Sequence, residues 1–289
     1  MTIADTIRRA AEQLATAGIE TARLDAEVLL AHLLKKDRVW LIAHNTDALD
    51  IDSASNYEYV VDRRAQREPL QHIVGNQEFW GLDFMVSPDV LIPRPETELV
   101  VESAIKAAEK MAAPLILDLC TGSGCIAISI AKHLAASRTM ATDWSGRALA
   151  IARENARHHG VADRIKFLEG DLFEPLEELD IQGKVDIIVA NPPYIPARDL
   201  AALQPEVRDH EPEMALIAGK QGTEIHQCII STAPRYLKQH GQLIMEMGMG
   251  QAAALVHMAR DTNAYETPEI LKDLAGIDRV IVVKKTTRT

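Results

Sequence analysis

Residues 115–124 read LILDLCTGSG, and this stretch decides the fold class. The apolar run 115–119 is typical of a short buried strand, and the glycines that follow let the backbone turn tightly before an apolar helix over 125–134. Further strands are predicted over 138–142, 165–168, 185–190, 242–247 and 280–283, with helical patterns among them. This alternation predicts an α/β fold in which helices cover a mostly parallel sheet.

The glycine turn lacks the features that bind a phosphate. A phosphate-binding loop would carry G-x-G-x-x-G or a Walker lysine, whereas Cys125, Ile126 and Ala127 follow Gly124. Asp118 precedes the turn instead, and a carboxylate at that place suits a cationic or amine-bearing ligand better than a pyrophosphate. The turn therefore predicts a nucleotide-type site for a ligand without phosphates.

Two further acids follow strands and are expected at the same edge of the sheet. Asp143 ends the second predicted strand, where an acid can bind both hydroxyls of a ribose. Asp171, followed by Leu172, comes after the third strand. Either aspartate alone could merely cap a helix. Three acids and a glycine turn at the carboxyl ends of neighbouring strands favour an adenosine pocket.

The tetrapeptide Asn191-Pro192-Pro193-Tyr194 ends the fourth predicted strand. Its two prolines remove two backbone N–H groups and fix φ, which leaves free and rigid carbonyls. Asn191 offers a side-chain acceptor, Pro192 a backbone acceptor and Tyr194 a flat face. The set predicts a site that binds a planar NH₂ group through both of its hydrogens. A rigid proline turn without a binding function is the alternative interpretation.

The chain before the sheet has two different patterns. Residues 1–72 carry helical periodicity and predict a small all-α domain. Residues 79–86 read FWGLDFMV, which is typical of a β-hairpin, and three prolines then exclude a helix until about residue 96. The expected organisation is a helical domain over 1–72, a β-hairpin linker over 73–95 and a sheet-containing domain over 96–289.

Composition narrows the class of protein. The 289 residues carry a net charge of −11, which disfavours a general nucleic-acid binder because an acidic surface repels phosphate. Three scattered cysteines form neither a disulfide framework nor a zinc spacing, so no metal is expected. The N-terminus lacks the apolar core of a signal peptide, and no apolar run reaches the roughly 20 residues of a membrane span. A cytoplasmic protein without a membrane partner is the expectation.

Two motifs together resemble a known family. Asn191-Pro192-Pro193-Tyr194 resembles the site of methyltransferases that modify adenine, cytosine or glutamine amides. The segment VLIPRPETELV at 90–100, preceded by FWGL at 79–82, is similar to the peptide chain release factor glutamine N5-methyltransferases, the PrmC/HemK family. The resemblance covers nearly the whole chain. It extends to EPLQ at 68–71, DLFEPL at 171–176, EP at 211–212 with AL at 215–216, and EMG at 246–248 with Gln251.

The resemblance implies a fold and an activity. Members have an N-terminal helical bundle that would recognise the substrate, a β-hairpin linker and a seven-stranded Rossmann-like catalytic domain. They use S-adenosyl-L-methionine to methylate the glutamine of the Gly-Gly-Gln motif in class-I peptide chain release factors by direct methyl transfer. Release factors are therefore the expected partners, and no direct contact with nucleic acid is expected.

The resemblance also assigns residues to the site. Asp143 would bind the ribose, Asp171 and Leu172 would border the adenine, and Asn191 would adjoin both cofactor and substrate. Asn191, Pro192 and Tyr194 would act in catalysis, and together with Pro193 they would bind the glutamine amide. The remaining cofactor-binding residues would be Asp118, Cys120, Thr121, Gly122, Ser123 and Gly124.

Several alternatives remain open. Cys120 stands where the family more often has glycine. The ribosomal protein L3 glutamine methyltransferase resembles this chain in having cysteine there, although that enzyme's linker resembles I-P-R-S-P instead. Leu172 stands where some members have tryptophan. Methylation of adenine N6 in nucleic acid and a non-catalytic module that binds release factors are further alternatives. Arg94 is expected to pair with Glu96 or Glu98, or with a carboxylate of a ligand.

Overall fold

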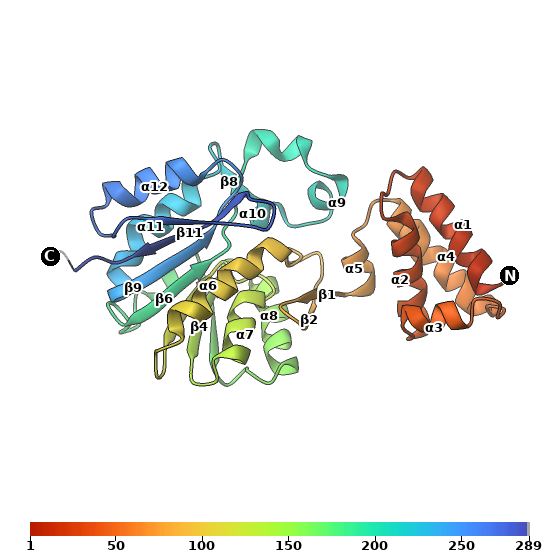
Figure 1. The fold of residues 1–289 in the computed structure, drawn as a ribbon, viewed down its shortest axis with the longest axis horizontal. Helices are drawn as coiled ribbons and strands as arrows, with labels where there is room; N and C mark the ends of the chain where they lie inside the picture. The colour runs from red at the N-terminus through yellow and green to blue at the C-terminus, as the bar shows by residue number, and fades with distance from the viewer. Residues whose placement is uncertain (288–289) are drawn as a thin grey trace. The chain divides into compact units, whose positions relative to one another are not determined.

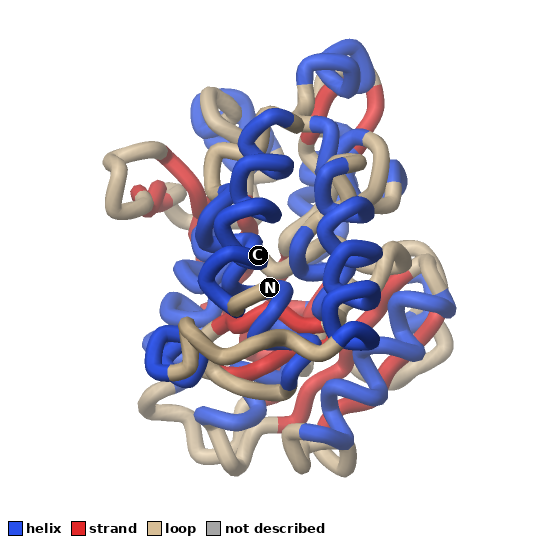
Figure 2. The backbone as a smooth tube through the Cα atoms, turned by 90° about the vertical axis from the view of Figure 1, so that its right-hand side faces the viewer, coloured by secondary structure: helices blue, strands red, loops and turns tan. Residues whose placement is uncertain are grey.

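The computed structural model describes residues 1–287, which form two compact units. The helical unit comprises Met1–Asn76 together with Gln204–His210. The sheet unit comprises Gln77–Leu203 and the chain from Glu211 onward. Figures 1 and 2 show helices joined by loops in the first unit, and a central sheet flanked by helices in the second.

The helical unit is built on amphipathic helices. Ile3, Ile7 and Leu14 repeat along one side of the first helix and are buried, while the Thr2 side chain accepts a hydrogen bond from the Asp5 N–H and caps its start. Gly18, with φ of 77°, follows the helix and ends it. The helices are α1 (Ile3–Thr16), α2 (Ala22–Leu34), α3 (Arg38–Ala43), α4 (Ile51–Ala65), α5 (Leu70–Val74) and α9 (Pro205–Arg208).

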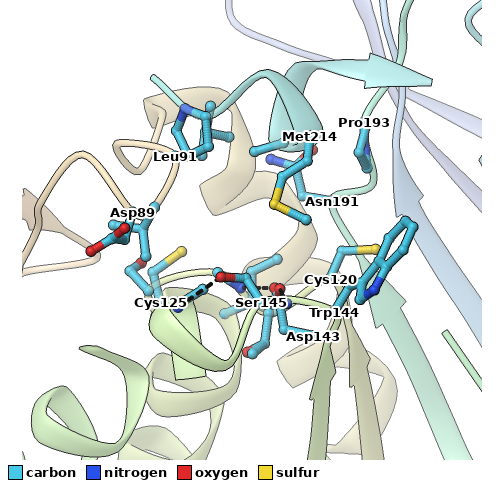
Figure 3. A pocket seen from close by; sticks show the side chains of 18 of the residues that line it. Asp89, Leu91, Cys120, Cys125, Asp143, Trp144, Ser145, Asn191, Pro193 and Met214 are labelled. Carbon is cyan, nitrogen blue, oxygen red and sulfur yellow. Dashed lines mark hydrogen bonds between the residues drawn. The ribbon is translucent and has the colours of Figure 1, made fainter. Parts of the chain in front are cut away.

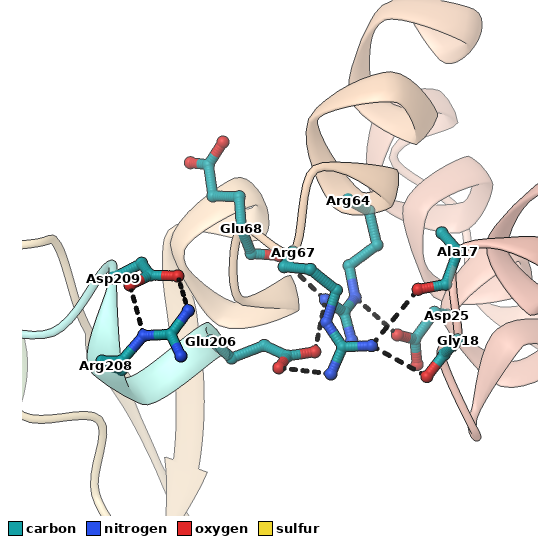
Figure 4. Close-up of polar contacts among 9 residues, drawn as sticks. All are labelled: Ala17, Gly18, Asp25, Arg64, Arg67, Glu68, Glu206, Arg208 and Asp209. Atoms are coloured by element: carbon teal, nitrogen blue, oxygen red, sulfur yellow. Dashed lines mark hydrogen bonds and ion pairs between the residues drawn. The ribbon is translucent and has the colours of Figure 1, made fainter. Parts of the chain in front are cut away.

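Helix α9 joins this unit through ion pairs, although it lies late in the chain. Glu206 accepts hydrogen bonds from Arg67 at 2.6 Å and from Arg64 at 3.1 Å, and Arg64 also donates to Asp25 at 2.8 Å (Figure 4). The Arg64 and Asp25 side chains are almost fully buried, so their charges are paired away from water. The chain therefore passes from one unit to the other three times: after residue 76, before residue 204 and after residue 210.

The predicted β-hairpin is confirmed by β1 (Asn76–Phe79) and β2 (Leu82–Met85), which pair with each other. Trp80 and Gly81 between them both have positive φ, 55° and 69°, as a tight two-residue hairpin turn requires. Phe79 and Phe84 are buried and pack edge to face with their ring centroids 6.0 Å apart. The hairpin thus contributes two aromatic rings to the core of the sheet unit.

The main sheet confirms the predicted fold class. Within residues 1–287 it has seven strands in the order β10-β11-β9-β6-β3-β4-β5. The strands from β9 to β5 are parallel, whereas β11 is antiparallel to both of its neighbours, β10 and β9. The chain builds outward from β3 through β4 to β5 and then returns to the other side of β3 with β6. The strands are β3 (Leu115–Leu119), β4 (Arg138–Asp143), β5 (Ile165–Glu169), β6 (Val185–Ala190), β9 (Leu237–Glu246), β10 (Glu269–Lys272) and β11 (Asp278–Lys284).

Helices cover both faces of the sheet (Figure 1). Alternate strand residues pack into two separate cores: Ile187 and Val189 face α6 and α7, whereas Ile188 and Ala190 face α11. Among residues 1–287, no helix has both the length and the apolar character that crossing a bilayer requires. The helices are α6 (Glu98–Ala108), α7 (Cys125–His133), α8 (Gly146–His158), α10 (Glu213–Leu216), α11 (Glu224–Tyr236) and α12 (Ala252–Asp261).

Short elements complete the sheet unit around the ends of these strands. They include a parallel pair formed by β7 (Ile195–Pro196) and β8 (Ile217–Gly219). The 3₁₀ turns are η1 (Pro95–Thr97), η2 (Glu174–Leu176) and η3 (Ala197–Ala202). The reversal of strand order beside β3 is a topological switch point, and such a point opens a crevice at the carboxyl ends of the strands.

Candidate functional site

A pocket lies at this switch point, within the sheet unit (Figure 3). Its walls come from loops that follow β3, β4, β5 and β6, and from the proline-rich segment before α6. Most residues that the sequence assigned to the site line this pocket: Cys120, Thr121, Gly122, Ser123, Asp143, Asp171, Leu172, Asn191 and Pro193. Asp118, Gly124, Pro192 and Tyr194 adjoin these residues in the chain but are not part of the lining.

The glycine turn after β3 has the backbone that its sequence predicts. Gly122 and Gly124 have φ of 55° and 81°, and the space beside Gly122 is open, because a Cβ there would have no atom within 4 Å. Cys120 also has positive φ, 58°, which strains a residue that carries a Cβ. This strain gives a physical reason for the glycine that the resemblance expects at position 120.

Gly124 is fixed by packing as well as by φ. A Cβ on Gly124 would lie 2.9 Å from the Ile128 Cδ1 and 3.2 Å from the Ala152 Cβ, so α7 and α8 leave no room for it. We expect Gly124→Ala to lower the free energy of unfolding by about 2–3 kcal/mol, from the backbone strain and the overpacking together. Denaturant unfolding measures this. Gly160→Ala is the matched control, because Gly160 has φ of 67° and open space at its Cβ.

Equal losses in the two glycine variants would contradict this account, because only Gly124 carries the steric contact. The Gly124 variant should also have an altered pocket wall, because the start of α7 and the turn before it must shift to admit the Cβ of alanine.

Asp118 lies beneath the turn and is fully buried. Its Oδ2 accepts hydrogen bonds from the Thr121 hydroxyl at 2.6 Å and the Ala127 N–H at 3.2 Å. Its Oδ1 has no hydrogen-bond partner among the residues that the structure describes. Burial raises the pKa of Asp118 to about 7, and these two hydrogen bonds offset part of that rise. One oxygen of this carboxyl group therefore stays without a partner beneath the turn, outside the pocket lining.

The raised pKa of Asp118 makes stability depend on pH. A carboxyl group whose pKa is higher in the folded state stabilises the fold at low pH, and this contribution is lost as the pH rises from about 4 to about 7. We expect Asp118→Asn to remove this contribution. The difference in unfolding free energy between pH 5 and pH 8 should then become smaller without vanishing, because Glu246, whose pKa is also about 7, keeps its own share.

Denaturant unfolding of the ligand-free protein at both pH values gives the measurement. An unchanged pH dependence in the Asp118→Asn variant would show that Asp118 does not titrate in this range.

Asp143 connects the ends of β3 and β4. Its carboxylate accepts hydrogen bonds from the Gly122 N–H at 2.8 Å and the Ser145 N–H at 2.9 Å. Burial raises the pKa of Asp143, and the two backbone donors oppose that rise. The Ser145 side chain caps α8 by accepting from the Ala148 N–H. Asp143 thus holds the glycine turn in place and lies at the pocket wall.

Trp144 is a pocket residue that the sequence reading missed. It follows Asp143, lines the pocket and keeps 69% of its surface exposed (Figure 3). A large exposed aromatic ring next to the expected ribose acid offers a flat apolar face. The sequence did carry a signal for this residue, because a tryptophan directly follows the acid that ends a predicted buried strand. Leu172, which the sequence did assign, has φ of 44°, so the backbone is strained on that wall too.

Hydrogen bonds hold three groups of the tetrapeptide after β6: the Asn191 side chain, the Tyr194 hydroxyl and the Tyr194 backbone carbonyl. Asn191 Nδ2 donates to the Thr97 hydroxyl at 3.0 Å, and the Tyr194 hydroxyl donates to Glu246 Oε1 at 3.2 Å. Gln251 Nε2 donates to the Tyr194 carbonyl at 2.9 Å. Thr97 and Glu246 belong to motifs of the family resemblance, but the sequence interpretation assigned them no role at the tetrapeptide, because they lie 94 and 55 residues from Asn191 in the chain.

Of the partners expected for Arg94, those within the chain were wrong. Arg94 donates to Glu211 at 2.5 Å rather than to Glu96 or Glu98. Glu211 also accepts from the Ile92 N–H at 3.3 Å, and its side chain is 1% exposed. A buried carboxylate is stable only when paired and hydrogen-bonded, and Glu211 satisfies both needs from one proline-rich segment. This pair fixes residues 92–94 along the pocket.

Two family models match parts of this chain. Residues 5–75 match the family model described as the PrmC N-terminal domain, and residues 101–283 match that of a methyltransferase domain. Two structures share the fold at low identity. The catalytic domain of hMettl16 in complex with a MAT2A 3'UTR hairpin has a TM-score of 0.57, is 16% identical and covers 80% of this chain and 82% of that one. A methyltransferase from Pyrococcus furiosus has a TM-score of 0.50, 15% identity, and coverage of 80% and 99%.

Similar sequences decide the family. The release factor glutamine methyltransferase of Geobacter sulfurreducens is 45% identical over 93% of this chain and 91% of its own length. The protein of the same name from Moorella thermoacetica is 41% identical over 96% and 97%. With this identity over nearly the full length of both chains, and with both domain models matched, the protein belongs to the family of release factor glutamine methyltransferases.

Proposed function

We propose that this chain methylates N5 of the glutamine side-chain amide in the Gly-Gly-Gln motif of class-I peptide chain release factors. The methyl donor is S-adenosyl-L-methionine. The names of the similar proteins support the substrate. The observation that carries the proposal is the pairing of β3 with β6, Leu119 opposite Ala190. It brings the glycine turn and Asn191 to one pocket, so a donor and an amide can meet there.

The residues present fit this cofactor. Open space beside Gly122 accommodates a ligand close to the backbone, and Asp143 lies where ribose hydroxyls can be bound. Trp144 and Leu172 border the pocket with apolar surface that suits an adenine ring. Asp118 lies beneath the turn and outside the lining, so it would serve the cofactor through the turn that it holds. When bound, the cofactor supplies a methyl group on a positively charged, strongly electrophilic sulfur.

The protein's own task is to orient a weak nucleophile. An amide nitrogen is a poor nucleophile because its lone pair is delocalised into the carbonyl. Asn191 Oδ1 and the Pro192 carbonyl would accept the two amide hydrogens, which raises electron density on the nitrogen and fixes its direction. Tyr194 would lie against the amide plane. The nitrogen loses one proton to solvent after the transfer, so no general base is required beforehand.

The helical unit would hold the protein substrate outside the pocket. Selecting one glutamine in a whole release factor needs contacts beyond a single side chain. The family model of this unit occurs with the methyltransferase domain in the same chain, which supports a shared task. The boundaries proposed from the sequence, at residues 72 and 95, remain a proposal for how this task is divided.

A labelling assay tests the function. Purified protein and radiolabelled S-adenosyl-L-methionine are incubated in parallel with a class-I release factor, ribosomal protein L3, DNA and RNA. We expect label in the release factor alone, and none when the glutamine of its Gly-Gly-Gln motif is replaced. Label in L3 but not in the release factor would favour the L3 enzyme, and label in nucleic acid would favour adenine methylation. No transfer to any acceptor would favour a binding module.

A further inference from the structure

A chain of hydrogen bonds connects Asn191 to a buried carboxylate. Asn191 Nδ2 donates to Thr97 Oγ1 at 3.0 Å, and the Thr97 hydroxyl donates to Glu246 Oε2 at 2.5 Å. Thr97 and Glu246 are each 1% exposed. The three residues come from the loop after β6, from η1 and from the end of β9. This series of hydrogen bonds therefore lies within the sheet unit, and two of its three residues are shielded from water.

The protons in this chain fix one orientation of the Asn191 amide. An ionised carboxylate has no proton to donate, so the single hydroxyl hydrogen of Thr97 must point to Glu246. The Thr97 oxygen can then only accept from Asn191, and the group that faces it must be the NH₂. The Asn191 carbonyl oxygen is consequently turned away from Thr97. Among residues 1–287, no group donates a hydrogen bond to that oxygen, and Asn191 lines the pocket.

We propose that Glu246 and Thr97 are positioning residues for methyl transfer: they set the Asn191 amide so that its oxygen, and not its nitrogen, is presented to the substrate amide. This inference rests on the proposed function, because it assumes that Asn191 accepts a hydrogen from the glutamine. The reversed amide would direct two hydrogens at the substrate NH₂ group, which also carries two, and would repel it.

The same carboxylate also holds Tyr194. The Tyr194 hydroxyl donates to Glu246 Oε1 at 3.2 Å, so one carboxyl group orients two of the four residues of the tetrapeptide. The backbone carbonyl of Glu246 accepts from His226 Nε2 at 2.8 Å. Burial keeps the pKa of His226 low, so this ring is neutral and adds no charge.

Titration of Glu246 gives the proposal a pH signature. Burial raises the pKa of Glu246 to about 7, the bonds from Thr97 and Tyr194 lower it, nearby Glu96 raises it and Arg279 lowers it. Once protonated, Glu246 can donate to Thr97, whose hydroxyl is then free to donate to the carbonyl end of a flipped Asn191 amide. Methyl transfer should therefore be full above about pH 7 and fall as the pH drops below it.

Thr97→Val tests the relay, since valine keeps the shape of threonine and removes the hydroxyl. With saturating cofactor and release factor, we expect kcat to fall by about 10- to 100-fold, the range for a misplaced group near the reacting atoms. The Kd for S-adenosylhomocysteine should stay within about twofold, and Thr97→Ser should restore most of kcat. The matched control is Thr139→Val, a buried threonine of β4 whose hydroxyl has no hydrogen-bond partner among the described residues.

The pH profile of kcat separates positioning from simple packing. Thr97→Val removes the hydroxyl through which protonated Glu246 acts on Asn191, so the fall of kcat on the acid side of the profile should flatten. Tyr194→Phe keeps this relay but removes a hydrogen bond that stabilises the ionised carboxylate, so its acid side should move to higher pH. If Thr97→Val does not fold, Tyr194→Phe and Thr97→Ser carry the test.

The outcomes distinguish this inference from the function on which it rests. An unchanged kcat in Thr97→Val overturns the inference, as does a serine variant no more active than the valine variant. An acid side that keeps its wild-type form in Thr97→Val, or that stays at the wild-type pH in Tyr194→Phe, also overturns it. A wild-type protein that labels no release factor refutes the proposed function instead, before any variant is compared.

Discussion

Replacing Asn191 by alanine is expected to lower kcat for release factor methylation by about 100- to 1000-fold. The change removes one of two acceptors that would direct the substrate amide nitrogen, and losing a single preorganised hydrogen-bonding group of this kind costs a comparable factor in other enzymes. The Kd for S-adenosylhomocysteine should change by no more than about twofold, because Gly122, Asp143 and Trp144 supply the cofactor walls of the pocket.

Single-turnover methylation with saturating cofactor measures this rate, and equilibrium titration of S-adenosylhomocysteine measures the affinity. Asn56→Ala is the matched control, since Asn56 is an exposed residue of α4 in the helical unit. A variant that keeps the wild-type rate would refute the mechanism. A variant that loses cofactor binding and rate together would show that Asn191 serves the cofactor and not the substrate.

The strands at the centre of the sheet could be predicted closely from the sequence. Residues 115–119 and 185–190 were assigned with the bounds that β3 and β6 have. Both strands are buried on both faces, so nearly every residue is apolar and the run ends where polar residues begin. Strand β10, Glu269–Lys272, was missed because four residues with charged ends carry no such pattern.

The membership of the helical unit could not be read from the sequence. The segment Gln204–His210 belongs to it through Glu206, whose partners Arg64 and Arg67 lie 142 and 139 residues earlier in the chain. Ion pairs leave no periodic signal, and nothing in the residues around Glu206 distinguishes this partly buried acid from the exposed acids of the chain. The pairing depends on the folded positions of both segments.

The candidate site shows the same limit. The acids at the strand ends were recognisable because parallel strands bring their carboxyl ends to one edge, whatever the detailed packing. The hydrogen-bond partners of the site residues could not be recognised in this way. The sequence assigned no partner to Glu246, yet its side chain accepts from Thr97 and Tyr194. Hydrogen bonds between distant segments follow from the tertiary structure, which the local pattern does not determine.

Asn155 carries the largest expected effect on stability. This residue of α8 is fully buried, and its side-chain amide makes three hydrogen bonds to backbone groups. Its Oδ1 accepts from the Met85 N–H at 2.8 Å, and its Nδ2 donates to the carbonyls of Met85 at 3.0 Å and Ser123 at 2.9 Å. One side chain therefore joins the end of the hairpin to the glycine turn of the pocket.

We expect Asn155→Ala to lower the free energy of unfolding by about 3–5 kcal/mol. Each buried backbone group left without a partner costs about 1–3 kcal/mol, and the change leaves one N–H and two carbonyls unpaired. Denaturant unfolding checks the value against Asn56→Ala, which also removes an amide from a helix but at an exposed position and should change stability by no more than about 0.5 kcal/mol.

The variant should also separate two roles of the hairpin. If the hairpin only fills the core, stability falls while cofactor affinity in the folded fraction is kept. Because Asn155 bonds directly to Ser123, whose backbone forms part of the turn that lines the pocket, we expect the Kd for S-adenosylhomocysteine to rise as well, by about tenfold. A loss below about 1 kcal/mol would mean that water replaces the three hydrogen bonds, and the hairpin would then not be anchored through Asn155.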